Sequence, residues 1–169
     1  MTTVKINDST LQQAASEGMD AFLQAVVEAT YKGIGGTLDA ESMQQLSANQ
    51  ITLLAWDILH NEVMDGGFIQ LIHNGYGRFI FRNPFAKAMR LWGIDGVATL
   101  VNRARKCYDK YHERIERDCT DEEFMAMFEQ MPEFDDCDDC FVENEEQWTA
   151  AIAYYVDEHL DEFITIEQD

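Results

Sequence analysis

Apolar residues recur every three or four positions along most of the chain, which is the spacing expected of helices that bury one face. Strong runs of this kind predict helices over residues 11–27, 51–63, 97–115, 124–131 and 148–164. Two helices begin with a capping box, in which side chains satisfy the first free N–H groups. Ser47 with Gln50 opens one, and Thr120 with Glu123 opens the other. Asp95 is the predicted cap of the helix that follows it.

Glycine and proline positions divide these helices and leave little room for strands. Interruptions fall at GIGG (Gly33 to Gly36) and at Gly66-Gly67, and Asn83-Pro84 starts a further helix because proline fits the first turn. Only Phe79-Ile80-Phe81 has the character of a short extended piece. Since no repeat, linker or break in composition divides the chain, the sequence predicts an all-α fold. We expect one compact domain over residues 1–169 with about seven helices.

Composition agrees with a folded globule. The chain is 46% hydrophobic and 11% aromatic, whereas disordered chains are poor in both classes. No apolar run approaches the roughly 18 residues that cross a bilayer, and the first residues, MTTVKINDST, lack the features of a signal peptide. Four cysteines are compatible with free thiols in a reducing compartment. These features predict a cytoplasmic protein that does not associate with membranes.

Charge is distributed very unevenly along the chain. The net charge is −20; residues 1–117 carry 13 acids and 12 bases, whereas residues 118–169 carry 19 acids and no base. We call residues 118–169 the acidic segment. Such an asymmetry predicts repulsion from nucleic acids and attraction to basic protein surfaces.

Three uses of the acidic segment compete. A disordered tail is disfavoured because the segment contains apolar positions at helical spacing, with Trp148, Tyr155 and Phe163 among them. A calcium loop is disfavoured because DDCDDC (Asp135 to Cys140) lacks the glycine and the oxygen ligands of an EF-hand. An acidic surface remains, either for solubility alone or for binding a basic partner.

The binding alternative rests on charge spacing. Helix neighbours three or four residues apart lie roughly 5–6 Å apart at Cβ, and each DNA strand presents one phosphate per roughly 3.4 Å of axis. A rigid array of carboxylates is therefore able to occupy a groove lined by Lys and Arg. The predicted contact residues are thirteen acids of the segment: Asp121, Glu122, Asp135, Asp136, Asp138, Asp139, Glu143, Glu145, Glu146, Asp157, Glu158, Asp161 and Glu162. The last four are predicted to form two like-charge i,i+4 pairs on the final helix.

The remaining chemistry-bearing residues point to no catalytic site. Cys137 and Cys140 have CxxC spacing, which suits half of a zinc site or a redox pair, but they fall in a predicted acidic loop where nearby carboxylates suppress the thiolate. The four histidines are scattered, and no nucleophile or phosphate-loop motif is present. We therefore predict no enzyme activity, no cofactor and no metal.

The stretch HNEVMDGGFIQLIHNGYG (His60 to Gly77) resembles the signature of a bacterial all-helical family, that of DNA mimic protein 19. The resemblance is carried by a Glu-Val, a Gly-Gly-Phe, a Gln, an Asn and a Gly, which here are Glu62, Val63, Gly66, Gly67, Phe68, Gln70, Asn74 and Gly77. Asp65 departs from the expected Asn. We interpret the motif as fold-determining: the glycine pair permits positive φ or close backbone approach, Phe68 packs, and Gln70 and Asn74 satisfy turn carbonyls.

The resemblance implies a homodimer whose negative surface imitates double-stranded DNA and occupies the DNA-binding face of a transcription regulator. This gives the first hypothesis, a DNA mimic that inhibits a helix-turn-helix repressor and does not itself bind nucleic acid. Two alternatives remain open at this stage. One is an immunity-type inhibitor of a basic toxin or nuclease, and the other is a CxxC metal-binding module.

Overall fold

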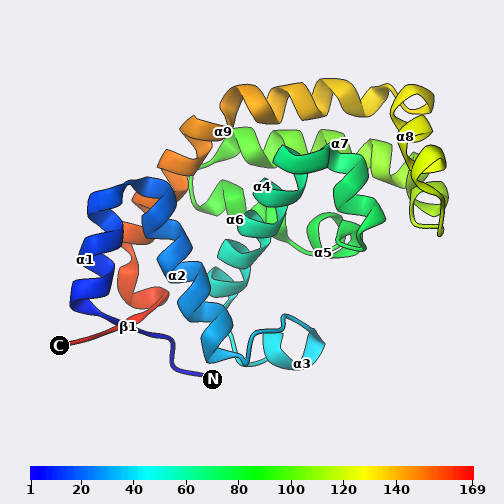
Figure 1. Cartoon of the computed structure of the whole chain (residues 1–169). Helices are drawn as coiled ribbons and strands as arrows, with labels where there is room; N and C mark the ends of the chain where they lie inside the picture. The colour runs from blue at the N-terminus through cyan, green and yellow to red at the C-terminus, as the bar shows by residue number, and fades with distance from the viewer. The chain divides into compact units, whose positions relative to one another are not determined.

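A computed structural model describes all residues, 1–169, and confirms the all-α class (Figure 1). Nine α-helices, one 3-10 helix and two short strands follow one another along the chain. Their bounds are β1 (Lys5–Asn7), α1 (Asp8–Glu17), α2 (Met19–Gly33), α3 (Ala40–Met43), α4 (Ala48–His73), α5 (Gly77–Phe81), α6 (Phe85–Leu91), α7 (Asp95–Ile115), α8 (Asp121–Gln130), α9 (Glu133–Glu158), η1 (Leu160–Glu162) and β2 (Thr165–Glu167). None of the helices combines the length and the apolar character needed to cross a membrane.

The chain divides into two compact units. The terminal unit comprises Met1–Leu54 together with Thr149–Asp169, and the central unit comprises Ala55–Trp148. The expected single domain over the whole chain stays a prediction, and each unit is described by itself.

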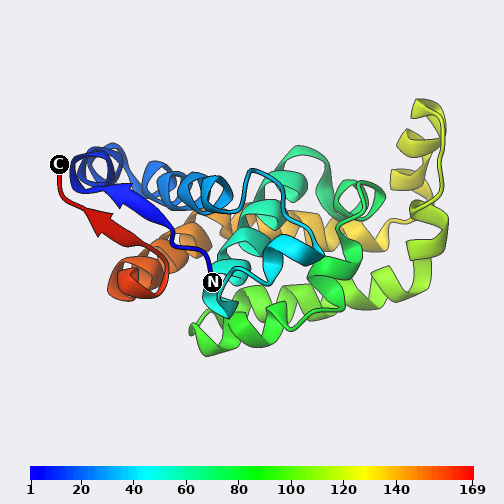
Figure 2. The ribbon, with the colours of Figure 1, turned by 90° about the horizontal axis from the view of Figure 1, so that it is seen from below.

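In the terminal unit the two ends of the chain pair with each other. Strands β1 and β2 are parallel, with Ile6 opposite Ile166, and lie side by side in Figure 2. The amide of Gln50 donates to the carbonyl of Phe163 over 2.8 Å, which joins the start of α4 to the chain before β2. Strands of three residues carry too little alternation of apolar and polar positions to be predicted. Their pairing also joins residues about 160 positions apart, which local sequence patterns do not reveal.

The central unit is built around the second half of α4. The side chains of Phe68, Ile69, Leu71 and Ile72 are completely buried. Figure 1 shows α9 running beside α7, and the ion pair between Lys110 and Glu133 joins the two helices. The apolar run of the signature is therefore core, as the sequence predicts for Phe68.

The glycine pair produces a kink inside α4. Gly66 and Gly67 have non-helical backbone angles, and Gly67 has φ 76°. A Cβ on Gly67 would lie 2.3 Å from a carboxylate oxygen of Asp138. Both expected roles of the glycine pair, positive φ and close approach, are confirmed.

The expected roles of Gln70 and Asn74 are wrong. The Gln70 amide donates to the carboxylates of Glu62 (2.8 Å) and Asp65 (2.9 Å), and the Asn74 amide donates to Glu62 (3.0 Å). These amides therefore bind carboxylates on the other side of the kink and not turn carbonyls. They do so because the kink brings the two halves of α4 within hydrogen-bonding distance of each other. The Asp at position 65 takes part in this network.

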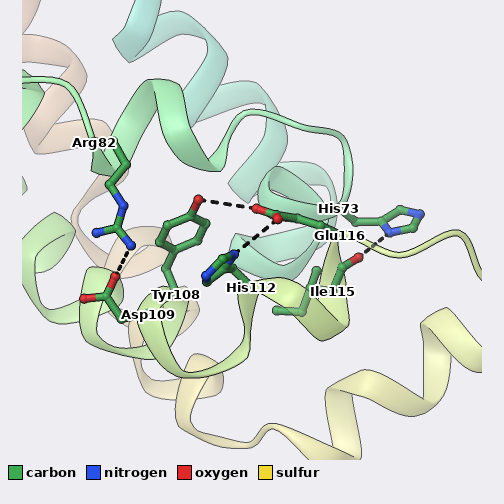
Figure 3. Close-up of polar contacts among 7 residues, drawn as sticks. All are labelled: His73, Arg82, Tyr108, Asp109, His112, Ile115 and Glu116. Atoms are coloured by element: carbon green, nitrogen blue, oxygen red, sulfur yellow. Dashed lines mark hydrogen bonds and ion pairs between the residues drawn. The ribbon is translucent and has the colours of Figure 1, made fainter.

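The last glycine of the signature makes room for a ring of α7. A Cβ on Gly77 would lie 2.4 Å from the Tyr108 ring. The Tyr108 hydroxyl donates to Glu116 (3.3 Å), and His73 Nδ1 donates to the Ile115 carbonyl (2.8 Å), so the end of α7 is held at several points (Figure 3). Gly77 is thus a packing position.

Five local predictions are corrected. Residues 79–81 are helical in α5, and Ile94 instead of Asp95 occupies the cap position of α7. The single run predicted over residues 11–27 is two helices that meet at Gly18, whose φ is 129°. The acidic loop predicted after Pro132 is helical from Glu133, and the last helix ends at Glu158 instead of continuing to residue 164. Phe134, Cys137 and Phe141 at helical spacing are the apolar signal that the density of charge obscured.

Replacing Gly77 with alanine is expected to reduce the free energy of unfolding by about 1–3 kcal/mol, because the new methyl group overlaps the buried Tyr108 ring. Urea unfolding followed by circular dichroism measures the change. Gly33→Ala is the matched control, since its nearest neighbour would lie at 3.4 Å and its backbone is helical. A Gly77→Ala protein as stable as the control would contradict the packing role.

Candidate functional site

The first part of α9, residues 133–148, carries its acidic residues on two different sides. Its apolar side is formed by Phe134, Cys137, Phe141 and Trp148, which are all buried in the central unit. Successive residues of a helix are rotated by about 100° around its axis. The remaining positions of this part of α9 therefore lie either at the edge of the buried side or on the outward side. The two groups of carboxylates differ in what they contact.

Five carboxylates point outward in one row, which we call the carboxylate stripe. All five members are exposed, and successive members are one, three or four positions apart along the helix: Asp135, Asp136, Asp139, Glu143 and Glu146. At 1.5 Å of rise per residue the stripe is about 16 Å long, or one carboxylate per about 4 Å. One strand of DNA presents a phosphate every roughly 3.4 Å of axis. The linear charge density of the stripe is therefore close to that of a single DNA strand.

Two carboxylates point inward and attach α9 to α4. Asp138 accepts a hydrogen bond from the Phe68 N–H over 2.8 Å, and Glu145 lies 2.6 Å from Nε2 of His60. The two acids are seven residues apart, which is two helical turns, and so lie on the same side of α9. Because both are engaged within the central unit, Asp138 and Glu145 serve to position the stripe and not to extend it.

Asp138 has a strongly perturbed acidity. Burial raises the pKa of Asp138 from 3.8 to about 6, with a smaller contribution in the same direction from Asp135 and Asp139. The hydrogen bond from the Phe68 N–H acts in the opposite direction because it stabilises the ionised form. The carboxylate caps the helical turn that restarts after the glycine kink.

The acidic residues of α8 have a local structural role as well as a potential binding role. Asp121, Glu122 and Glu123 occupy the first turn of α8, where negative charge is favoured by the exposed N–H groups. The predicted capping box is confirmed: the Thr120 hydroxyl accepts from the Glu123 N–H (3.1 Å), and the Glu123 carboxylate accepts from the Thr120 N–H (3.3 Å). Asp121 and Glu122 are exposed beside this cap.

Bases of α7 lie close to the start of α9, which the sequence does not reveal. Lys110 forms an ion pair with Glu133 at 3.0 Å, and Tyr111 donates a short hydrogen bond to the same carboxylate. The Tyr111 hydrogen bond and the Lys110 hydrogen bond lower the pKa of Glu133. The acidic segment contains no base, yet at Glu133 it is compensated by a base 23 positions earlier in the chain. The stripe begins two residues beyond this pair.

The four remaining predicted contact residues belong to the terminal unit. Asp157 and Glu158 end α9, and Asp161 and Glu162 lie in η1; all four are exposed. The predicted i,i+4 like-charge pairs are wrong because α9 ends between their members. Glu162 accepts a hydrogen bond from the Asn49 amide over 3.2 Å. The thirteen candidates thus fall into two groups in different units.

The cysteines form no recognisable metal centre. All four are free thiols; Cys137 is buried and Cys140 is half-buried. Burial raises the pKa of the Cys137 thiol, which disfavours the thiolate that metals bind. No group of three or more His, Cys, Asp or Glu side chains is arranged to hold a metal ion. The CxxC metal-binding hypothesis receives no support from this geometry.

Comparison with known proteins places the chain in a family. The model of the DMP19-like protein family matches residues 44–159. The chain belongs to the DMP19-like family. One relative, "DNA mimic protein DMP19" of Neisseria meningitidis serogroup B (strain ATCC BAA-335 / MC58), is 33% identical over 169 residues, and the match covers 99% of each chain. The family resemblance predicted from the His60–Gly77 signature is confirmed.

The region matched to the DMP19-like family contains the parts that form the stripe. Residues 44–159 include the kinked α4, the glycine signature and the whole of α9. The paired terminal strands lie outside it. The signature identifies the family, whereas the outward carboxylates are found only by following the helical periodicity of α9.

The Asp138→Asn variant isolates the pH dependence of the α4–α9 contact. Because the folded-state pKa of Asp138, about 6, exceeds its ordinary value of 3.8, the stabilisation from binding this proton is full below about pH 4 and is lost as the pH rises through 6. The asparagine oxygen can still accept from the Phe68 N–H. We therefore expect the parent to lose stability relative to Asp138→Asn between pH 4 and pH 7.

The measurement is the free energy of unfolding of both proteins across that range. The Asp139→Asn variant, which changes an exposed neighbour, is the control and is expected to show a smaller change relative to the parent. A difference between parent and Asp138→Asn that is constant with pH, or that favours the parent at higher pH, would contradict the buried carboxylate.

Proposed function

We propose that this protein is a DNA mimic that binds the DNA-binding surface of a transcription regulator, of the helix-turn-helix repressor type, and prevents operator binding. The observation that carries the proposal is the carboxylate stripe, five exposed acids in one row on a helix anchored by Asp138 and Glu145. The relative named "DNA mimic protein DMP19" supports the same function.

The anchoring of the stripe supports mimicry over a general role in solubility. Solubility requires charge but no fixed arrangement of charges. Like charges three or four residues apart each cost a few tenths of a kcal/mol in a helix, and none of the five stripe residues has an ion pair within the central unit. A partner that supplies Lys and Arg side chains would remove this repulsion.

The proposed mechanism is competitive occupation. Carboxylates of the stripe take the places of phosphates against the Lys and Arg side chains that position a regulator on its operator. Asp121 and Glu122 on α8 are further candidate contacts in the central unit, and Asp157, Glu158, Asp161 and Glu162 are candidates in the terminal unit. The role requires no catalysis, no cofactor and no contact with nucleic acid. Attraction is expected to weaken with salt, since the Debye length falls to about 8 Å at physiological ionic strength.

The oligomeric state and the class of basic partner are two further points. The homodimer implied by the family resemblance stays a prediction, which analytical ultracentrifugation measures. A basic toxin or nuclease would meet the same electrostatic surface, but no feature of the geometry favours such a partner over a regulator. We therefore propose only the regulator.

A triple neutralisation of the stripe, Asp139→Asn with Glu143→Gln and Glu146→Gln, is expected to weaken partner binding about tenfold or more, since each lost ion pair contributes up to about 1 kcal/mol. For the measurement, the protein is used to capture DNA-binding proteins from the host lysate at low salt. Each captured protein is then bound to its own operator DNA. Release of that DNA is then followed by fluorescence anisotropy as the parent or the variant is added.

The control changes the net charge by the same amount at exposed positions outside the acidic segment: Glu28→Gln with Glu41→Gln and Glu113→Gln. We expect this variant to release operator DNA nearly as well as the parent. Equal loss in both triple variants would show that net charge alone matters, and no loss in the stripe variant would contradict the assigned surface.

A further inference from the structure

We propose that a groove in the terminal unit accepts an arginine side chain of the basic partner. The groove lies where the turn between α1 and α2 meets the C-terminal part of α9, and both elements belong to that unit. The inference deepens the proposed function and rests on it for the nature of the partner. It concerns a site separate from the carboxylate stripe.

The groove is small. Its volume is about 270 Å³, whereas pockets for drug-sized ligands and cofactors occupy roughly 300–1,000 Å³. Small residues, Gly18, Ala150 and Ala153 among them, line it and leave the space open. Apart from Gly18 itself and its two chain neighbours, no residue has an atom within 4 Å of where a Cβ on Gly18 would be.

The other lining residues offer a large apolar and aromatic surface to solvent. Met19 is 56% exposed and Tyr154 is 68% exposed, which places them among the most exposed large apolar side chains of the chain. Both line the groove. An occupant with an apolar stem would remove this surface from water. Exposed apolar side chains that are scattered singly offer an occupant no such combined surface.

The charge at the groove selects a cation. Asp157 is the only charged residue that lines it, is exposed, and forms no ion pair. The terminal unit contains 12 acids but only two bases, Lys5 and Lys32. Lys5 already pairs with Glu167 at 3.2 Å. The field at the groove is therefore negative, and the unit has little basic charge to fill the site from within.

An apolar stem that ends in a positive charge describes Arg and Lys side chains, and arginine fits better. The guanidinium is more weakly hydrated than an ammonium, stacks on aromatic faces such as that of Tyr154, and binds a carboxylate with two parallel N–H groups. DNA offers arginine a comparable place, because narrow minor grooves with strong negative potential accept inserted Arg side chains. The groove would give a regulator's arginine a protein counterpart of that environment.

The test is a titration of the full-length, ¹⁵N-labelled protein with three short peptides that differ only in their central residue. Acetyl-Gly-Arg-Gly-amide is the probe, and the citrulline and norleucine peptides are neutral comparisons. We expect the arginine peptide to shift the amide signals of Gly18, Ala150 and Ala153, with at least fivefold weaker binding by the citrulline peptide. Equal binding by the norleucine or citrulline peptide, or no shift at these amides, would overturn the proposal.

Variants separate the two parts of the site. Tyr154→Ala and Asp157→Asn are each expected to weaken binding of the arginine peptide roughly three- to fivefold, from the loss of a cation–π contact and of an ion pair. Glu28→Gln and Leu91→Ala are matched controls, an exposed acid of the same unit and a similarly exposed apolar residue that do not line the groove. Unchanged binding in both groove variants would contradict the assignment.

Failure of this inference is distinguishable from failure of the proposed function. If the arginine peptide binds the groove but the protein releases no captured regulator from its operator, the groove proposal stands and the mimic proposal fails. If operator DNA is released and the peptide leaves the groove amides unchanged, the mimic proposal stands and the groove proposal fails.

Discussion

The hydrogen bond from the Phe68 N–H to the Asp138 carboxylate is the contact on which the candidate surface depends. It forms only because Gly67 adopts φ 76° and lacks a Cβ, which would lie 2.3 Å from that carboxylate. Two turns further along α9, Glu145 meets His60. With α9 held at these two points, helical periodicity directs Asp135, Asp139, Glu143 and Glu146 to solvent. The glycine signature and the acidic surface are therefore parts of one arrangement within the central unit.

The acidic residues divide into those that support the fold and those that have no partner. Asp138 and Glu145 position α9, Glu123 caps α8, and Glu133 pairs with Lys110. The carboxylate stripe has no comparable partner in the central unit. Mutual repulsion along it is small for each pair, and no ion pair offsets it. A basic partner therefore accounts for the stripe better than solubility does.

Helical periodicity, capping boxes and glycine breaks predict most helices, the all-α class and the special role of Gly66-Gly67. The sequence did not predict that residues 133–147 form a helix, although Phe134, Cys137 and Phe141 have helical spacing, because the density of carboxylates suggested a loop. The pairing of Lys110 with Glu133 and of β1 with β2 joins positions far apart in the chain, so local patterns do not reveal it. Whether an acid points inward or outward, as Asp138 and Asp139 do, is decided by the packing partner, here α4.

The central claim is that the carboxylate stripe is the surface that meets the partner, and covalent labelling of carboxylates tests it most directly. The protein is treated with a carbodiimide and glycine ethyl ester, alone and with a captured regulator bound, and modification is quantified by mass spectrometry. We predict that Asp139, Glu143 and Glu146 lose reactivity in the complex, whereas Glu28 and Glu41 do not. Unchanged reactivity along the stripe, with protection elsewhere, would contradict the claim.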